Sequence, residues 1–217
     1  SKAKDSYGNA YHVTKQIDDR TFGPKQDLGI VVATSYAGGL ESAHIKHAGD
    51  ELVIILNDDG KLFSDIILSL QTDRYISLHD MGNFTAEKRI VAEQKRTLNN
   101  ARKESIEAAV ITYLQNAEMY IKGVELPISS SSNVKGRVEE GLRELVEKVY
   151  TNLPMIQGRA YSDSTVSAAF TDDLSDMFGQ DSEAEQQIMF RIESEKRKGS
   201  NTTIKALVDN YATIPYG

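Results

Sequence analysis

The sequence contains no cysteine and no tryptophan, and only four of its 217 residues are proline. Without cysteine the chain has no disulfides, thiolate nucleophiles or cysteine-ligated metals, which fits a reducing cytoplasm. The longest aliphatic run, Leu52–Leu56, is far too short to span a bilayer. The first residues are charged and lack the apolar region of a secretory signal. We therefore expect a cytoplasmic protein with no membrane partner.

Phosphate-binding motifs are missing as well. Neither a G-x-x-x-x-G-K-[ST] loop nor a G-x-G-x-x-G turn occurs, so no segment offers a recognisable cradle for a nucleotide. The run Val53–Asp58 has the outline of a Walker B strand, whose terminal acids hold Mg²⁺. Without a phosphate loop we interpret this run as a core strand followed by a turn. We expect no catalytic residue and no cofactor.

Other patterns that could carry chemistry have structural explanations. His44 and His47 are spaced like a pair of metal ligands, but no acid at a zinc-site spacing accompanies them, so we predict no metal site. Paired carboxylates can act as general acid and base, but turns and helix caps account equally for the acidic doublets Asp18-Asp19, Asp58-Asp59 and Asp172-Asp173. A serine triad cannot be assembled without arbitrary choices, which leaves an independent hydrolase as our third hypothesis.

What the chain does contain is the composition of a globular protein. Hydrophobic residues make up 40% and charged residues 26% of it, and its length can bury a core as one large domain or two small ones. The net charge of -7 argues against a surface built wholly for nucleic acid, but it leaves room for a local basic face.

Glycine-punctuated runs of β-branched residues predict a small β-sheet in residues 1–60, notably at Ile30–Thr34 and Leu52–Leu56. Residues 61–217 show helical spacing over most of their length. The predicted class is therefore α+β, with an N-terminal sheet region followed by a predominantly helical region. The two regions could also form one continuous domain.

One long helix dominates the predicted helical region. We expect it to begin after the N-cap Thr85 and to run to Lys122, where Gly123 would end it. Another helix is predicted over Val134–Val149, where valines and leucines lie on one face. Residues 180–217 could form a helix-turn-helix, but the last helix carries a single lysine, which favours a structural helical hairpin.

Basic pairs recur every seven residues along the long helix. Seven residues are almost two turns, so the pairs drift by about 20° per step and share one face over roughly 23 Å. Such a face could follow a phosphate backbone or an acidic partner. We favour the interpretation that it is a solvated surface, because glutamates at helical spacing can pair with these side chains. The candidate contact residues are Lys88, Arg89, Lys95, Arg96, Arg102 and Lys103.

Several segments, in this order along the chain, resemble one protein family: Glu51–Asp59, Leu70–Ile76, Ala117–Gly123, Arg137–Tyr150 and Leu207–Gly217. The series is similar to BrxC/PglY, the P-loop ATPase component of bacteriophage exclusion (BREX) systems, over about residues 29–217. These segments are structural rather than catalytic. The resemblance implies that the nucleotide-binding motifs of the family lie outside this chain.

The resemblance implies an internal fragment of a large bacterial phage-defence ATPase, and a first residue of serine rather than methionine agrees with that expectation. We expect a non-catalytic structural or interaction module. Its partners would be the other domains of the parent ATPase and other BREX proteins. The alternative is a nucleic-acid-binding module that uses the basic helix face, for which we expect weak binding.

Overall fold

The structure is a computed structural model, and it describes residues 2–5, 10–37, 49–78, 84–128, 133–156 and 183–216. The chain divides into two compact units. The first unit comprises Ser1–Lys4 and Ala10–Leu145, and the second comprises Asp5–Asn9 and Val146–Gly217.

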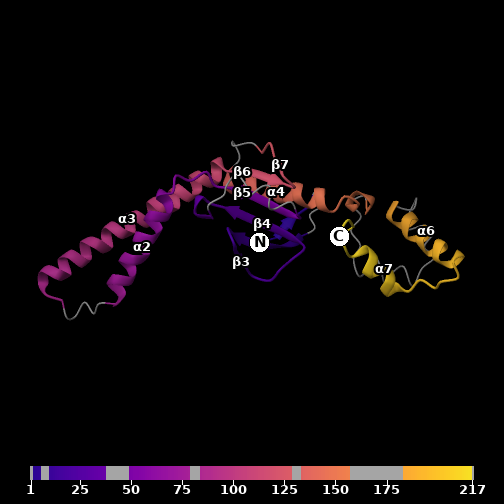
Figure 1. Cartoon of the computed structure of the whole chain (residues 1–217), viewed down its shortest axis with the longest axis horizontal. Coiled ribbons are helices and arrows are strands. Elements are labelled where there is room, and N and C mark those ends of the chain that lie inside the picture. The colour runs from indigo at the N-terminus through magenta and orange to yellow at the C-terminus, as the bar shows by residue number, and fades with distance from the viewer. Residues whose placement is uncertain are drawn as a thin grey trace, which may run out of the picture. The chain divides into compact units, whose positions relative to one another are not determined.

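A mixed β-sheet forms the core of the first unit (Figure 1). Its strand order is β1-β2-β4-β5-β6-β7, and the short strand β3 pairs with β2. Strands β2, β4 and β5 are parallel, and the other pairs are antiparallel. The strands are β1 (Lys2–Lys4), β2 (Ala10–Ile17), β3 (Arg20–Phe22), β4 (Leu28–Ala33), β5 (Glu51–Ile55), β6 (Glu118–Ile121) and β7 (Val124–Glu125).

The two central parallel strands are the apolar runs that the sequence singles out. A parallel strand covered on both faces needs apolar residues at every position, and in β5 the residues Leu52–Ile55 are all buried. In β4, residues Leu28, Val31 and Ala33 are buried. The predicted α+β class, with an N-terminal sheet and one long helix, is confirmed.

Five α-helices and two short 3-10 helices complete the described elements. Helices α2 and α3 run side by side as a helical hairpin in the first unit (Figure 1). The predicted N-cap is confirmed, because the Thr85 side chain accepts a hydrogen bond from the amide of Lys88. The helices are α2 (Lys61–Leu78), α3 (Ala86–Asn116), α4 (Val134–Val149), α6 (Glu183–Arg197) and α7 (Ile204–Tyr211), with the 3-10 helices η1 (Ser35–Ala37) and η3 (Leu153–Ile156).

The predicted end of the long helix at Lys122 is wrong. Helix α3 stops at Asn116, and the next residues form β6, in which Met119 and Ile121 are buried beside β5. Their spacing of two residues fits a strand with one buried face. Lys122 and Gly123 both have positive φ, as a two-residue hairpin turn between β6 and β7 requires. Gly123 therefore turns a β-hairpin instead of capping a helix.

Helix α4 covers part of the sheet and follows the predicted bounds. Its residues Leu142 and Leu145 are buried. At Gly141 an added Cβ would lie 3.0 Å from the Leu52 side chain, so the missing side chain lets α4 approach β5 closely. On the same helix the buried Arg137 donates hydrogen bonds to carbonyl oxygens at the end of α3, those of Leu114, Gln115 and Ala117.

In the second unit, local capping defines the ends of α6 and α7. Gly199 adopts a positive φ just after α6, and the Thr203 side chain accepts a hydrogen bond from the amide of Ala206 to begin α7. The ring of Tyr211 packs edge-on against that of Tyr216 at a centroid distance of 4.7 Å. The helix-turn-helix interpretation of residues 180–217 stays a prediction.

Some predicted features fall on residues outside the described ranges, namely His44, His47 and the doublet Asp172-Asp173. Of the helices that are described, none is both long and apolar enough to cross a bilayer. Strands β6 and β7 join the sheet from within the predicted helical region, residues 61–217.

Leu145→Ala should lower the free energy of unfolding by about 2–5 kcal/mol, because its side chain is 0% exposed and its removal leaves a cavity. Glu147→Ala, at an exposed position of the same helix, should change it by less than about 0.5 kcal/mol. Chemical denaturation of the whole chain measures both values. Equal stabilities of the two variants would show that α4 does not pack as described.

Candidate functional site

The basic residues of α3 lie beside the surface that packs on α2. On α3 that surface includes the buried Ala92 and Asn99, seven residues apart. On α2 the buried residues Leu62 and Ser69 are also seven apart. A repeat of seven keeps one face of a helix against its neighbour. The hairpin is therefore a short antiparallel coiled-coil-like pair.

Each basic pair straddles this contact surface. Lys95 comes four residues before Asn99 and Arg96 three residues before it. The two side chains therefore lie on opposite sides of the helix–helix contact. The same holds for Lys88 and Arg89 relative to Ala92. The sequence analysis placed all six side chains on one shared face. In the structure, the packing against α2 occupies the middle of that face.

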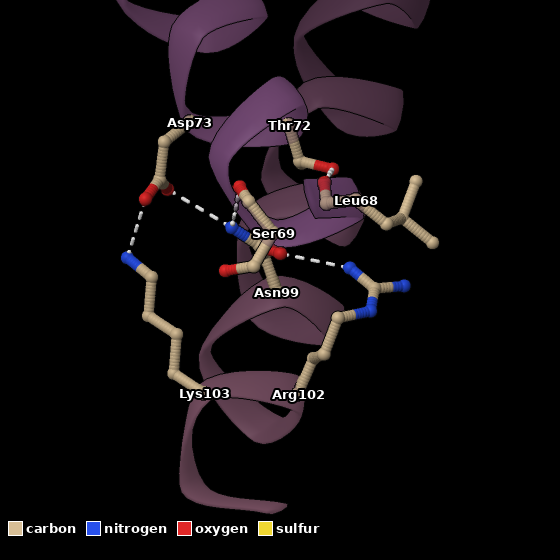
Figure 2. A network of polar contacts seen from close by, with 7 residues as sticks. All are labelled: Leu68, Ser69, Thr72, Asp73, Asn99, Arg102 and Lys103. Atoms are coloured by element: carbon tan, nitrogen blue, oxygen red, sulfur yellow. Dashed lines mark hydrogen bonds and ion pairs between the residues drawn. The ribbon is translucent and has the colours of Figure 1, made fainter. Parts of the chain in front are cut away.

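A polar layer interrupts the apolar packing of the hairpin (Figure 2). Asn99 is only 1% exposed, and its Nδ2 donates to the carbonyl oxygen of Ser69 at 3.0 Å and to Oδ1 of Asp73 at 2.9 Å. Its Oδ1 accepts from Nη1 of Arg102 at 2.8 Å. The Nζ of Lys103 lies 2.7 Å from Oδ2 of Asp73. We call these five residues the polar layer.

A buried amide is costly unless its donors and acceptor are satisfied. In the polar layer Nδ2 of Asn99 donates to Ser69 and Asp73 of α2, whereas its Oδ1 accepts from Arg102 of its own helix. A shift of α2 by one turn would move Ser69 and Asp73 away from this buried donor. The polar layer therefore selects the register of the hairpin, as a single buried asparagine does in coiled coils.

The charges within the polar layer are partly solvated. A hydrogen bond from Lys103 lowers the pKa of Asp73 and outweighs the opposing effect of desolvation, and a hydrogen bond from Asn99 lowers the pKa further. Asp73 is therefore ionised at neutral pH. Both side chains of the pair are 46% exposed, so the pair orients the side chains more than it stabilises the fold.

The remaining predicted contact residues are exposed on α3. Arg96 forms an ion pair with Glu93 at 3.5 Å. Lys88 and Lys95 line a shallow pocket together with Tyr75 of α2. With Arg102 and Lys103 engaged in the polar layer, the six basic side chains do not form one open surface.

A second group of acids lies at the carboxyl ends of the parallel strands, where ligands bind in many open α/β sheets. Asp18 accepts hydrogen bonds at 2.8 Å from both the amide and the hydroxyl of Thr34. Asp58 accepts from the amide and the hydroxyl of Ser35 and from the amide of Gly60. These acids therefore organise the loops that follow β2, β4 and β5.

Burial by itself would raise the pKa of Asp58, but its hydrogen bonds from Ser35 and Gly60 outweigh this effect and lower the pKa. Its neighbour Asp59 accepts from the amide of Lys61 at the start of α2 and from the Tyr113 hydroxyl, both at 3.0 Å. Within the described ranges, no three acidic or histidine side chains are grouped as a metal site would need. The geometry therefore favours a structural role for these acids, in shaping turns and in capping the start of α2.

The sequence analysis missed the large apolar side chains that the hairpin exposes. Leu98 is 59% exposed on α3, and Leu70 is more than half exposed on α2. Exposed apolar clusters often mark surfaces that bind other proteins. The sequence offered one signal for this exposure, namely the apolar residues of α2 and α3 that fall outside the seven-residue repeat. The exposed set is Ile67, Leu68, Leu70, Tyr75, Leu78, Ile90, Val91, Leu98 and Ile111.

Asn99→Ala should destabilise the chain by about 1–3 kcal/mol, because Arg102 and the Ser69 carbonyl lose a buried partner. Asn100→Ala, at the exposed neighbouring position, gains the same helix propensity without losing a partner and should not destabilise. Urea denaturation of the two variants gives the difference. If Asn99→Ala is as stable as Asn100→Ala, the polar layer does not select the register.

Lys103→Met should raise the pKa of the Asp73 carboxyl toward its ordinary value of 3.8. Because the pKa of Asp73 is lowered in the folded state, the ion pair stabilises the fold at pH values above the ordinary pKa of 3.8. This stabilisation is lost as the pH falls through the lowered pKa. Lys95→Met should leave the Asp73 titration unchanged. NMR titration of the carboxyl carbon measures both, and an unaltered Asp73 pKa in Lys103→Met would contradict the pairing.

Comparison with known proteins gives one family. The family described as "BREX ATP-binding protein BrxC 4th domain with six-stranded beta sheet" matches residues 1–145. The order of six strands from β1 to β7, with β3 attached to β2, agrees with that description. Searches of curated proteins and of solved structures find no match. The match covers most of the 217 residues and includes the sheet and the helical hairpin, and the chain therefore belongs to the family of the fourth domain of the BREX ATP-binding protein BrxC.

Proposed function

We propose that this chain is a non-catalytic structural and interaction module of a large BREX phage-defence ATPase, and that the helical hairpin is its interaction element. The observation that carries this proposal is the exposed apolar set on α2 and α3. A hairpin held in one register by the polar layer offers these side chains on a rigid surface. Rigid presentation reduces the entropy lost when a partner binds.

The non-catalytic part of the proposal rests on how the acids are used. Asp18, Asp58 and Asp59 accept hydrogen bonds from neighbouring backbone or hydroxyl groups, as their role in shaping loops requires. The sequence contains no phosphate-binding loop. ATP hydrolysis is therefore assigned to other parts of the parent protein.

A nucleic-acid-binding module is the second hypothesis, and two observations count against it. Arg96, Arg102 and Lys103 each have a partner within the chain. The net charge of -7 also opposes the approach of a polyanion. We expect only weak, salt-sensitive binding of nucleic acid. The proposed partners are other domains of the parent ATPase and other BREX proteins in the bacterial cytoplasm.

The double substitution Ile90→Glu and Leu98→Glu in the full-length parent protein should abolish phage protection, because it removes two exposed apolar side chains of α3 that would contact the partner. The rate of ATP hydrolysis by the parent should stay unchanged. Gln94→Glu is the matched control, since Gln94 lies between these two residues on the same helix face. Plaque assays and an ATPase assay of the purified protein measure the two outcomes.

Full phage protection by the double variant would contradict the assignment of the hairpin. The nucleic-acid hypothesis is tested by fluorescence anisotropy with single- and double-stranded DNA at about 0.15 M salt. Sub-micromolar affinity that is lost on Lys95→Glu with Arg96→Glu would make that hypothesis the leading one, because each phosphate contact contributes through counterion release.

A further inference from the structure

An apolar groove of about 930 Å³ lies on the sheet beside α4, separate from the helical hairpin. One wall is the helix, which contributes Val134, Val138 and Leu142 at intervals of four residues. The floor is formed by side chains of three neighbouring strands, namely Ile17 of β2, Phe22 of β3, and Ile30 and Val32 of β4.

The strand pairing explains why these side chains meet. Lys15 pairs with both Phe22 and Ile30, and Ile17 pairs with Val32, so the side chains project from one face of the sheet. Ile30 in turn pairs with Leu52, the residue that α4 approaches at Gly141. The floor of the groove is thus the continuation of the face that α4 covers.

A single helix cannot cover this face. Strands lie about 4.8 Å apart, whereas a helix with its side chains is roughly 10 Å wide. Helix α4 lies over β5, and within the described part of the chain no second helix lines the groove over β2, β3 and β4. Ile17 is accordingly 47% exposed and Phe22 is 50% exposed. Three strands span about the width of one further helix.

The lining of the groove carries positive charge. Lys2 of β1, Lys15 of β2 and Lys135 of α4 line it, against a single acid, Glu139. That acid lies 3.8 Å from Lys135 on the same helix, which leaves a positive excess along the groove. Lys15 projects from the floor between Phe22 and Ile30. An occupant with acidic residues beside its apolar face would complement this lining.

We propose that this groove binds an amphipathic α-helix of another polypeptide, with aliphatic residues on one face and acidic residues along both borders of that face. The helix lies alongside α4 and completes the layer over β2, β3 and β4. A groove of one helix width, with a largely apolar floor and an excess of lysine in its lining, matches the helix-in-groove mode of recognition. The groove lies on a face of the sheet and is not an open strand edge, which disfavours strand addition.

The probe is a fluorescein-labelled synthetic helical peptide of about 18 residues, with leucine and isoleucine at i, i+3, i+4 and i+7 and glutamate on both flanks. A second peptide has the same apolar residues with lysine on the flanks. Anisotropy titrations with the whole 217-residue chain should show at least about tenfold tighter binding of the glutamate peptide.

Phe22→Glu should weaken binding of the glutamate peptide by at least about tenfold, because it places a like charge on the apolar floor. Val124→Glu is the matched control, since Val124 is a 60% exposed residue of β7 outside the groove. Lys15→Glu with Lys135→Glu should reverse the preference and make the lysine peptide the tighter ligand. Circular dichroism verifies that the variants keep the fold.

Several outcomes would overturn the proposal. They are an absence of saturable binding by the glutamate peptide, equal affinity for both peptides, and binding that Phe22→Glu leaves unchanged. Self-association of the chain that only Phe22→Glu removes would assign the groove to a second copy instead. Binding to anionic phospholipid vesicles with the same sensitivity, but no binding of the peptide, would assign it to a membrane surface.

Discussion

The buried guanidinium of Arg137 holds together the parts of the first unit. It donates hydrogen bonds from α4 to the carbonyl oxygens of Leu114, Gln115 and Ala117, at the point where α3 ends and β6 begins. The last carbonyls of a helix have no hydrogen-bond partners within it, and they form the negative end of its dipole. A buried cation there supplies hydrogen bonds to these carbonyls and also interacts favourably with the dipole. This contact stabilises the end of the helix at the point where the chain passes into the sheet beside β5.

The contact surface of α3 decides how its charges are placed. This contact with α2 runs through Ala92 and Asn99, and the basic pairs fall on both sides of it. Of the charged side chains that suggest nucleic-acid binding in the sequence, Lys103 pairs with Asp73 of α2 and Arg102 donates a hydrogen bond to Asn99. The exposed apolar side chains of the hairpin are the physical basis for proposing an interaction module.

Both proposed binding surfaces follow from incomplete coverage of apolar elements. A sheet six strands wide needs more than one helix on a face, and a two-helix hairpin buries only the side chains between its helices. The groove beside α4 and the exposed apolar set of the hairpin are two such surfaces among the described residues of the first unit. A domain within a larger protein can cover such surfaces with neighbouring domains or with other proteins.

The sequence by itself determined the features that depend on neighbouring residues. Apolar runs predict β4 and β5, Thr85 caps α3 through its own turn, and the one-sided spacing of valines and leucines predicts α4. The family was visible for the same reason, in the order of these segments. Only the tertiary structure decided the strand at Glu118–Ile121, the partners of Asn99 and the uncovered floor around Phe22. Each depends on residues distant in the chain: pairing with β5 overrides the helical spacing, α2 supplies the partners of Asn99, and the position of α4 leaves one side of the sheet open.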